Sequence, residues 1–260
     1  MNTQSQSINS SGSVSILKIL ASESLNEWRR SIRMPMFAIP SLLFPWMFYL
    51  FFGVAFNKGG SAAATYLLIS YACFGIIGPA LFGFGVSVAI DRERGILALK
   101  RAVAMPISAY FYAKIFMSLA FAVIILVGFA IIANFIAQVS LTFTSWLQLV
   151  FILLSGTLPF CALGLAIGTW VNAQAAPAVV NLIYLPMAFI SGLWIPIHLL
   201  PNWLQELAWF LPPYHLSQLA LKLINFGQGH HWAIHLSALF GFTVLFLSAA
   251  TLGFKRIKDR

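Results

Sequence analysis

Six long apolar runs limit what this chain can fold into more than any other feature. Each could cross the roughly 30 Å hydrocarbon core of a bilayer as a helix. Helices are the expected form because backbone groups in lipid must hydrogen-bond within their own segment, and no run alternates as a barrel strand does. The sequence therefore predicts an all-α integral membrane protein with six transmembrane helices. The predicted spans lie at about 37–56, 65–90, 109–135, 147–171, 176–195 and 232–253.

The composition points to the same class. Hydrophobic residues make up 60% of the chain and charged residues 8%, whereas a soluble domain is about half apolar and about a quarter charged. The net charge is +9, but the basic residues lie at the ends of apolar runs and form no polar domain, which argues against a nucleic-acid partner. Cys73 and Cys161 fall inside apolar runs and are interpreted as small core residues rather than a disulfide or metal site.

The basic residues also predict the orientation of the chain. Thirteen of the 15 lie within residues 18–33, 92–114 and 255–260, while Lys58 and Lys222 belong to the other side. Basic loops are retained in the cytoplasm, and an even number of spans places both termini on one side. We therefore expect both termini to be cytoplasmic.

The two ends of the chain are expected to lie outside the bilayer. Residues 1–13 are polar and uncharged, which predicts a disordered tail. Residues 14–33 carry apolar side chains at spacings of three and four, which is typical of an amphipathic helix on a membrane surface. Residues 14–255 then form one membrane domain, and residues 256–260 form a basic cytoplasmic tail. No signal peptide is visible, since the first long apolar run begins near Phe37.

The stretch DRERGILALKRAVAMP at 91–106 holds six of the 21 charged residues. Each charge would cost about 2.5–3.5 kcal/mol at the centre of a bilayer, so the stretch must lie outside the hydrocarbon. Gly95 can end the second span, and Ile96, Leu99 and Val103 then share one face of a short helix. The loop could serve only to fix orientation. However, orientation needs bases rather than acids, and mixed charges beside an apolar stripe suit docking on a soluble protein.

Residues 192–231 are too long and too apolar for a simple loop. We expect two short re-entrant or interfacial helices between spans five and six, the first capped by Asn202 and stopped by Pro212, and the second within 214–225. His231 and His235 are four residues apart and could share a metal, but no third ligand is evident. Histidines at the interface without a metal are the favoured interpretation.

Few polar groups occur inside the predicted spans. Gly164 and Gly168 have the spacing of close helix packing, and Asn181 should face protein or a water-filled path. No acidic or basic residue lies deep in a span, which argues against a proton- or sodium-coupled transporter and favours a hydrophobic or amphipathic cargo. The chain has no GxxxxGK[ST], HExxH, CxxC or GxSxG motif, so we expect no ATP site and no catalytic residues.

Three segments together carry a family resemblance. They are the amphipathic N-terminal segment, DRERGILALKRAVAMPISAYFYAK, and NLIYLPMAFISGLWIPIHLLPNWLQELAWFLPPYHLSQLAL. The chain resembles, over about residues 14–255, the permease subunit of the second type of ATP-binding cassette (ABC) exporter, such as bacterial drug-resistance, nodulation and polysaccharide export permeases. It departs from the family pattern at Ile96, where Thr is common.

The resemblance implies how such a subunit would work. It implies a homodimer of permeases in a bacterial plasma (inner) membrane, surrounded by lipid. It also implies two cytoplasmic ABC ATPase subunits that bind ATP and Mg, while this chain holds no cofactor. The substrate path would lie between spans two and five, closed outside by residues 192–215 and lined by Phe82, Asn181, Tyr184 and Met187. The ATPase-coupling residues would be Glu27, Arg30, Asp91, Arg92, Glu93, Arg94, Gly95, Leu97, Lys100 and Arg101.

Two other functions remain open at this point. One is an ATPase-independent transporter or channel. The other is a membrane-embedded enzyme acting on lipids, for which only Glu206 with His198 or His215 could supply the ionisable groups. Drugs, lipids, glycans and lipopeptides are all compatible with the sequence as cargo.

Overall fold

The computed structural model describes residues 15–57, 59–103, 105–227 and 230–258, and within them every regular element is a helix. The predicted tail at 1–13 and the last two residues of the predicted basic tail lie outside the described residues. The elements in chain order are α1 (Ile16–Ile32), α2 (Pro35–Phe48), the π-helix η1 (Tyr49–Ala55), α3 (Gly60–Glu93), α4 (Ile96–Ala102), α5 (Ile107–Phe135), α6 (Phe143–Ser155), α7 (Leu158–Trp170), α8 (Ala176–Ile190), the short 3₁₀ helix η2 (Ile197–Leu199), α9 (Asn202–Ala208), α10 (Pro212–Lys222) and α11 (Trp232–Lys258).

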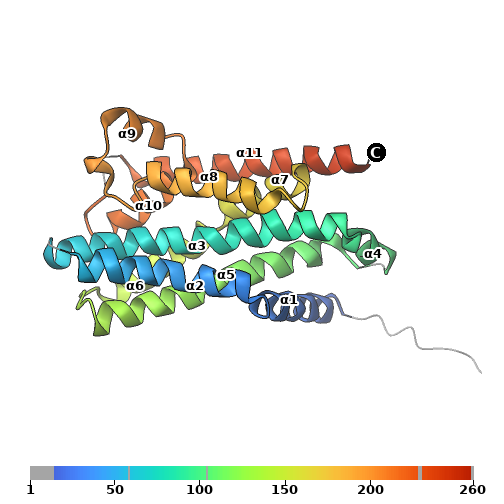
Figure 1. Cartoon of the computed structure of the whole chain (residues 1–260), viewed down its shortest axis with the longest axis horizontal. Helices are drawn as coiled ribbons and strands as arrows, with labels where there is room; N and C mark the ends of the chain where they lie inside the picture. Colours follow the sequence, from blue (N-terminus) through green and yellow to red (C-terminus); the bar gives the residue numbers. More distant parts are fainter. Residues whose placement is uncertain (1–14, 58, 104, 228–229, 259–260) are drawn as a thin grey trace, which may run out of the picture.

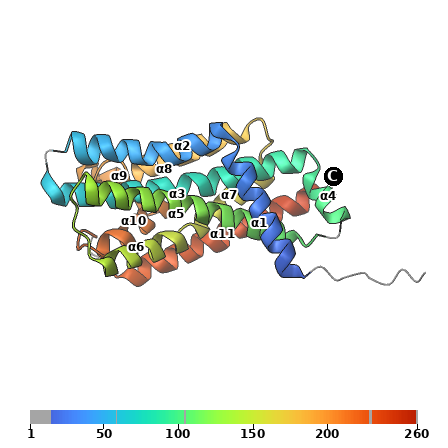
Figure 2. The ribbon, with the colours of Figure 1, turned by 90° about the horizontal axis from the view of Figure 1, so that it is seen from below.

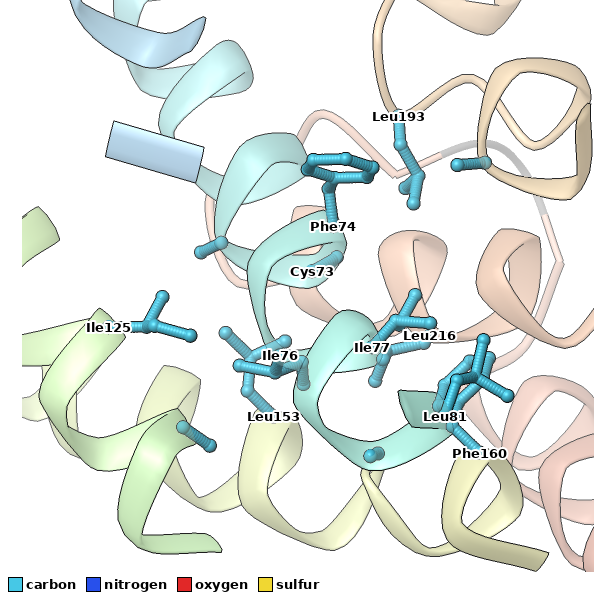
Figure 3. Close-up of a cluster of buried hydrophobic side chains, with 14 of the residues drawn as sticks. Cys73, Phe74, Ile76, Ile77, Leu81, Ile125, Leu153, Phe160, Leu193 and Leu216 are labelled. Carbon is cyan, nitrogen blue, oxygen red and sulfur yellow. The ribbon is translucent and has the colours of Figure 1, made fainter. Parts of the chain in front are cut away.

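Helix α3 is the central element of the bundle, with helices packed around it (Figures 1 and 2). Its 34 residues are apolar almost throughout and mostly buried, as expected of a helix surrounded by others. Figure 3 shows Ile76, Ile77 and Leu81 of α3 in a buried cluster with Leu153 and Phe160 from the following helices. The core of the molecule is therefore built along α3.

Helices α3 and α7 pack closely at two positions where the residue is glycine and no side chain separates the backbones. A Cβ at Gly164 of α7 would lie 2.9 Å from the Leu81 carbonyl oxygen, and one at Gly168 would lie 2.9 Å from the Gly85 carbonyl oxygen. Both distances are too short for any side chain, so the backbones of α3 and α7 touch. The close packing that the sequence predicts at Gly164 and Gly168 is thus found against α3.

The two ends of the bundle differ in composition, and we name them for it. The charged end comprises α1, α4, the last turn of α3 and the first turns of α5, and the chain's C-terminus lies beside it (Figure 1). The aromatic end lies at the opposite end of the bundle and comprises residues 192–227, which include α9, and the first turns of α11 (Figure 1). Helix α1 crosses the bundle obliquely at the charged end (Figure 2).

Five helical segments are long and apolar enough to cross a membrane. They are Pro35–Ala55, Gly60–Glu93, Ile107–Phe135, Phe143–Trp170 and Trp232–Arg256. The run predicted as a span at 176–195 instead forms the 15-residue helix α8 followed by a turn at Gly192. Fifteen residues rise about 22 Å, which is short of the hydrocarbon core, so a count of six spans depends on α8.

Two of the segments are interrupted in ways that periodicity does not reveal. The first continues from α2 into seven residues of π-helix, where Gly53 leaves room for the Tyr49 ring. The fourth breaks between α6 and α7, because Gly156 and Thr157 end one helix and Pro159 sits in the first turn of the next. Such interruptions are tolerated where neighbouring helices bury them.

The short helices agree with the expected positions, although one buried face differs. Helices α9 and α10 fall where two short helices are predicted, and α4 follows Gly95. The predicted cap of the first helix is wrong, because Asn202 is already inside α9 and Pro201 stands at the cap position without a side-chain hydrogen bond. Helix α9 also ends at Ala208, and Pro212 begins α10. In α1 the apolar side chains of Leu17, Leu25 and Ile32 are exposed while Glu27 is buried, so the polar face packs on the bundle. An outward apolar face suits the membrane surface, and that placement stays a prediction.

Candidate functional site

The acidic residue that opens the charged stretch is buried inside the protein. Asp91 has no exposed surface and lies in the last turn of α3. Its Oδ1 is 2.8 Å from Nη2 of Arg30 on α1, and its Oδ2 accepts a hydrogen bond of 2.8 Å from the Tyr110 hydroxyl on α5. Nζ of Lys114 lies 3.4 Å from the same Oδ2. Asp91 therefore joins α1, α3 and α5 from within.

Lys114 completes this cluster. It is fully buried on α5, its Nζ donates to Oε1 of Glu27 at 2.7 Å, and it also donates to the Ser87 hydroxyl. Two acids and two bases thus balance, which is the condition under which charges can be buried. Burial alone lowers the pKa of Arg30, but its hydrogen bond to Asp91 and the nearby negative charges outweigh this and raise the pKa overall.

The next two residues of the charged stretch face a different part of the molecule. The Arg92 guanidinium donates to the carbonyl oxygens of Gly168 at 3.1 Å, Thr169 and Val171 at 2.8 Å. Glu93 Oε1 accepts a 2.9 Å hydrogen bond from the Ala173 backbone N–H. Both contacts bind the end of α7 and the short connection to α8.

The remaining predicted coupling residues are distributed along the turn and α4. Arg94 is exposed, and Gly95 adopts a left-handed φ of 71° that favours glycine. Leu97 is buried, and Lys100 pairs with Glu23 of α1. The helix places Arg101 within α4, but its side chain is outside the described part of the structure.

The apolar face predicted for this short helix points outward. Leu99 and Val103 are 64% and 68% exposed. Arg94, two residues before α4, is also exposed, so the charged end has both apolar and basic groups on its surface around α4. Such a mixed surface is suited to contact with another molecule.

A pocket of about 310 Å³ lies between α2, α3 and α8. Three of the four residues predicted to line a substrate path are part of it, namely Phe82, Asn181 and Tyr184, whereas Met187 is buried nearby and is not among the lining residues. The lining is aromatic, aliphatic and small, and its described residues include no Asp, Glu, Lys, Arg or His. They are Met36, Phe37, Pro40, Ser41, Phe44, Pro45, Phe74, Gly75, Gly78, Phe82, Asn181, Tyr184 and Leu185.

An aromatic cluster joins this pocket to the aromatic end. The Phe74 ring stacks on Tyr184 with centroids 5.0 Å apart, and the Tyr184 hydroxyl donates to the Phe74 carbonyl oxygen at 2.7 Å. Trp194 packs edge-on against Phe74 at 5.6 Å and stacks on Phe48 at 5.8 Å. The turn after α8 therefore supplies a ring that packs on Phe74, one of the residues that line the pocket.

The histidines form a pair that their spacing does not predict. His235 contacts His215 rather than His231, with the two Nδ1 atoms 3.0 Å apart, and Nε2 of His215 bonds the Trp209 carbonyl oxygen at 2.8 Å. Burial lowers the pKa of His215, an effect that the hydrogen bond to Trp209 partly opposes. Among the described residues no three potential ligands gather around a metal position.

Several residues of these sites were missed by sequence reasoning. Lys114 was counted only as a basic residue near a span, and Tyr110 and Glu23 were not singled out. Phe74 was not separated from the many other aromatic residues of the apolar runs. The one available signal was Lys114 itself, since a base two turns into a long apolar run needs an acidic partner.

Comparison with known proteins bears on these sites. The family model described as "ABC-2 type transporter" matches residues 24–225, which include most of α1, the charged stretch, the pocket and most of the aromatic end. A Bacillus subtilis (strain 168) protein named "Putative transport permease YvfS" is 26% identical over 215 residues. That alignment covers 82% of this chain and 88% of the relative.

Proposed function

Because the chain belongs to the ABC-2 type transporter family, whose permeases typically work with an ATPase partner, we propose that it is the membrane-spanning subunit of an ATP-driven exporter. It moves a hydrophobic or amphipathic substrate, such as a drug, a lipid or a glycolipid-like molecule. Separate cytoplasmic ABC subunits bind ATP and Mg and hydrolyse the nucleotide. This chain contributes the path and no catalysis of its own.

The observation that carries the proposal is the pocket between α2, α3 and α8. Its lining offers aromatic and aliphatic surface with the amide of Asn181 and the hydroxyl of Ser41 as polar groups, a combination typical of sites for apolar molecules. A charged cargo would lack partners there. The cluster of Phe74, Tyr184 and Trp194 would act as the outer closure of the path, and Met187 would become part of the path when it opens.

The charged end supplies the surface for the ATPase. Arg94, Leu99 and Val103 are exposed and would make direct contact. Asp91, Glu27 and Arg30 are occupied by one another and by Lys114, so their contribution is to hold α1 and α3 in position. Lys100 does the same through Glu23.

The proposed assembly is a homodimer in the inner membrane of a bacterium. We count six spans, taking α8 as the fifth, which leaves both termini in the cytoplasm, as the distribution of basic residues favours. Helix α8 exposes Leu182 (74%) and Leu185. A second copy covering this face would enclose the neighbouring pocket residue Asn181.

Co-purification with a candidate ABC ATPase subunit from the same organism tests the proposal. The two proteins, expressed together, should purify as a complex, and Arg94→Glu with Leu99→Glu should abolish the association because both exposed positions become acidic. Asn202→Glu is the matched control, since it adds an acid to an exposed position at the aromatic end, and it should leave the complex intact.

Transport in vesicles provides the second half of the test. Proteoliposomes holding the complex should export rhodamine 6G or a fluorescent phospholipid only with ATP. Equal transport by the isolated chain without the ATPase would contradict the proposal and favour an ATPase-independent transporter. Failure of the wild-type proteins to associate would contradict it as well.

A further inference from the structure

Arg92 and Glu93 bind the end of α7 and the turn that precedes α8, rather than forming part of the docking surface. We propose that these two residues are positioning residues, which transmit movement of α4 and the end of α3 to α8 and so to the pocket. The inference rests on the proposed function. The inference divides the charged stretch into residues that contact the proposed ATPase and residues that transmit movement of the ATPase to α8 and the pocket.

The Arg92 contacts lie where α7 has unpaired backbone groups. The last carbonyl groups of a helix have no partner within the helix and form its negative end. The Val171 N–H is bonded to the Ile167 carbonyl, which leaves the Gly168 and Thr169 carbonyls to the Arg92 guanidinium. The planar guanidinium can reach several oxygens at once, which a lysine ammonium does less well.

The connection from α7 to α8 is short and internally bonded. It has five residues, from 171 to 175. Asn172 closes it, because its side-chain oxygen accepts from the Ala175 N–H at 2.8 Å and its carbonyl accepts from the Ala176 N–H at 3.0 Å. Glu93 holds the middle of this turn through the Ala173 N–H. A turn so constrained passes displacement on to α8 instead of absorbing it.

The other contacts of this region favour movement as a unit. Gly164 and Gly168 bring the backbones of α3 and α7 into direct contact, so the two helices and the Arg92 bonds form one body. Helix α8 starts directly after it and carries Asn181 and Tyr184 into the pocket. A displacement at the end of α3 therefore reaches the pocket through fewer than a dozen residues of chain.

Hydrogen exchange in the whole permease–ATPase complex tests this link. Exchange of residues 176–190 is compared between the nucleotide-free complex and the complex trapped with ATP and vanadate. In the wild type, trapping should change exchange along α8. Arg92→Lys, which keeps the charge but loses the planar fork, and Glu93→Ala, which removes the bond to Ala173, should each lose most of this change while ATP hydrolysis continues.

The controls separate a transmitting role from a structural one. Gln174→Ala alters an exposed residue of the same turn and should keep the full nucleotide-dependent change. A merely structural role would lower ATP hydrolysis and complex yield together with the change in exchange. Should Arg92→Lys fail to fold, Glu93→Ala remains decisive, since Glu93 is exposed and buries nothing.

Each outcome bears on a different claim. A nucleotide-dependent change of wild-type size in both variants would overturn the inference and leave the proposed function standing. A wild-type protein that binds no ATPase would overturn the proposed function and this inference with it. A wild-type complex that hydrolyses ATP without any change along α8 would overturn the inference alone.

Discussion

The charged end and the aromatic end of the bundle are stabilised by different kinds of contact. At the charged end, ion pairs join residues far apart in sequence, such as Glu27 with Lys114 and Arg30 with Asp91. At the aromatic end, rings, prolines and the His215–His235 pair pack without a single ion pair among the described residues. A buried ion pair loses its stabilising effect when one of its two charged partners is removed. Packed rings instead depend on how well their shapes fit together. The two ends should therefore respond to different changes.

The largest effect is expected at the centre of the charged end. Lys114→Met removes one of the two bases that balance Glu27 and Asp91 and leaves Arg30 to face both buried acids. Breaking a buried ion pair in this way costs about 3–5 kcal/mol. Thermal unfolding of the purified protein in detergent, followed by tryptophan fluorescence, should show a marked fall in Tm. Lys18→Met, at an exposed site on α1, should leave Tm nearly unchanged.

A second substitution sharpens this test. Asp91→Asn in the Lys114→Met background removes the negative charge that is in excess and should restore part of the lost stability, because the effects of substitutions in one network are not additive. If Lys114→Met unfolds at the same temperature as Lys18→Met, the charged end does not depend on its ion pairs.

One glycine at each end of the bundle has a left-handed backbone with a similar φ, so substitutions at these two positions allow the charged and aromatic ends to be compared. Gly192 and Gly95 have φ values of 77° and 71°, and an alanine in the left-handed region costs about 1–2 kcal/mol at either site. A Cβ at Gly192 would lie 2.9 Å from the Cβ of Ile197, while at Gly95 no described atom lies within 4 Å. Overpacking adds about 1–3 kcal/mol at Gly192 alone.

Gly192→Ala should therefore lower Tm more than Gly95→Ala. The difference in Tm measures how tightly the turn at Gly192 is packed against Ile197, independently of backbone strain. Equal losses at both glycines would mean that the turn at the aromatic end can shift away from Ile197, and the description of that end as shape-dependent would be wrong.

The two ends should also differ in their response to acid. Because burial lowers the pKa of His215 below its ordinary value of 6.5, the folded protein keeps this ring neutral while the unfolded chain takes up a proton. Stability should therefore stay level above pH about 6.5, the ordinary pKa of this ring in the unfolded chain. It should fall as the pH drops from there to the lower pKa of the folded protein. The raised pKa of Arg30 keeps that group charged throughout.

The double variant His215→Phe with His235→Phe isolates this effect. Trp209, Tyr214, Phe242, Lys222 and His230 also face the pair, and the double variant leaves them in place. Protonation of both rings disrupts the hydrogen bond between the Nδ1 atoms of His215 and His235. A hydrogen bond of this kind contributes about 0.5–1.5 kcal/mol to stability. The variant should lose that part of the dependence of Tm on pH between 5 and 7, and a slope unchanged from the wild type would assign it to other groups.

Sequence reasoning succeeded where a feature depends on nearby residues. Period and hydropathy placed the long helices within a few residues, and the left-handed turn at Gly95 follows from glycine chemistry. Gly164 and Gly168 were expected to permit close packing and do so against α3. Asn181 was expected to face protein or a water-filled path because it is an amide in an apolar run, and it lines the pocket. Phe82 also lines the pocket but was named only through the family resemblance, and a role of either residue in a substrate path stays a prediction.

Features that depend on tertiary contacts could not be predicted in this way. The partners of Lys114 are 23 and 87 residues away, at Asp91 and Glu27, and no local pattern links them. The direction of Arg92 depends on where α7 ends relative to α3. The length of α8 was overestimated because hydropathy continues past Ile190, where the left-handed Gly192 turns the chain.

The smallest effect is expected for the ion pair at the rim of the charged end. Lys100 and Glu23 are both partly accessible to solvent, so Lys100→Gln should cost only about 0.2–1 kcal/mol, as for other accessible pairs. High salt should reduce even this difference in Tm, because salt screens accessible charges much more than buried ones. Lys100 and Lys114 both pair with acids of α1 and differ chiefly in burial. If the two substitutions lowered Tm equally, burial would not explain why the charged end is sensitive, and the role of its ion pairs would have to be sought in the contact with the ATPase instead.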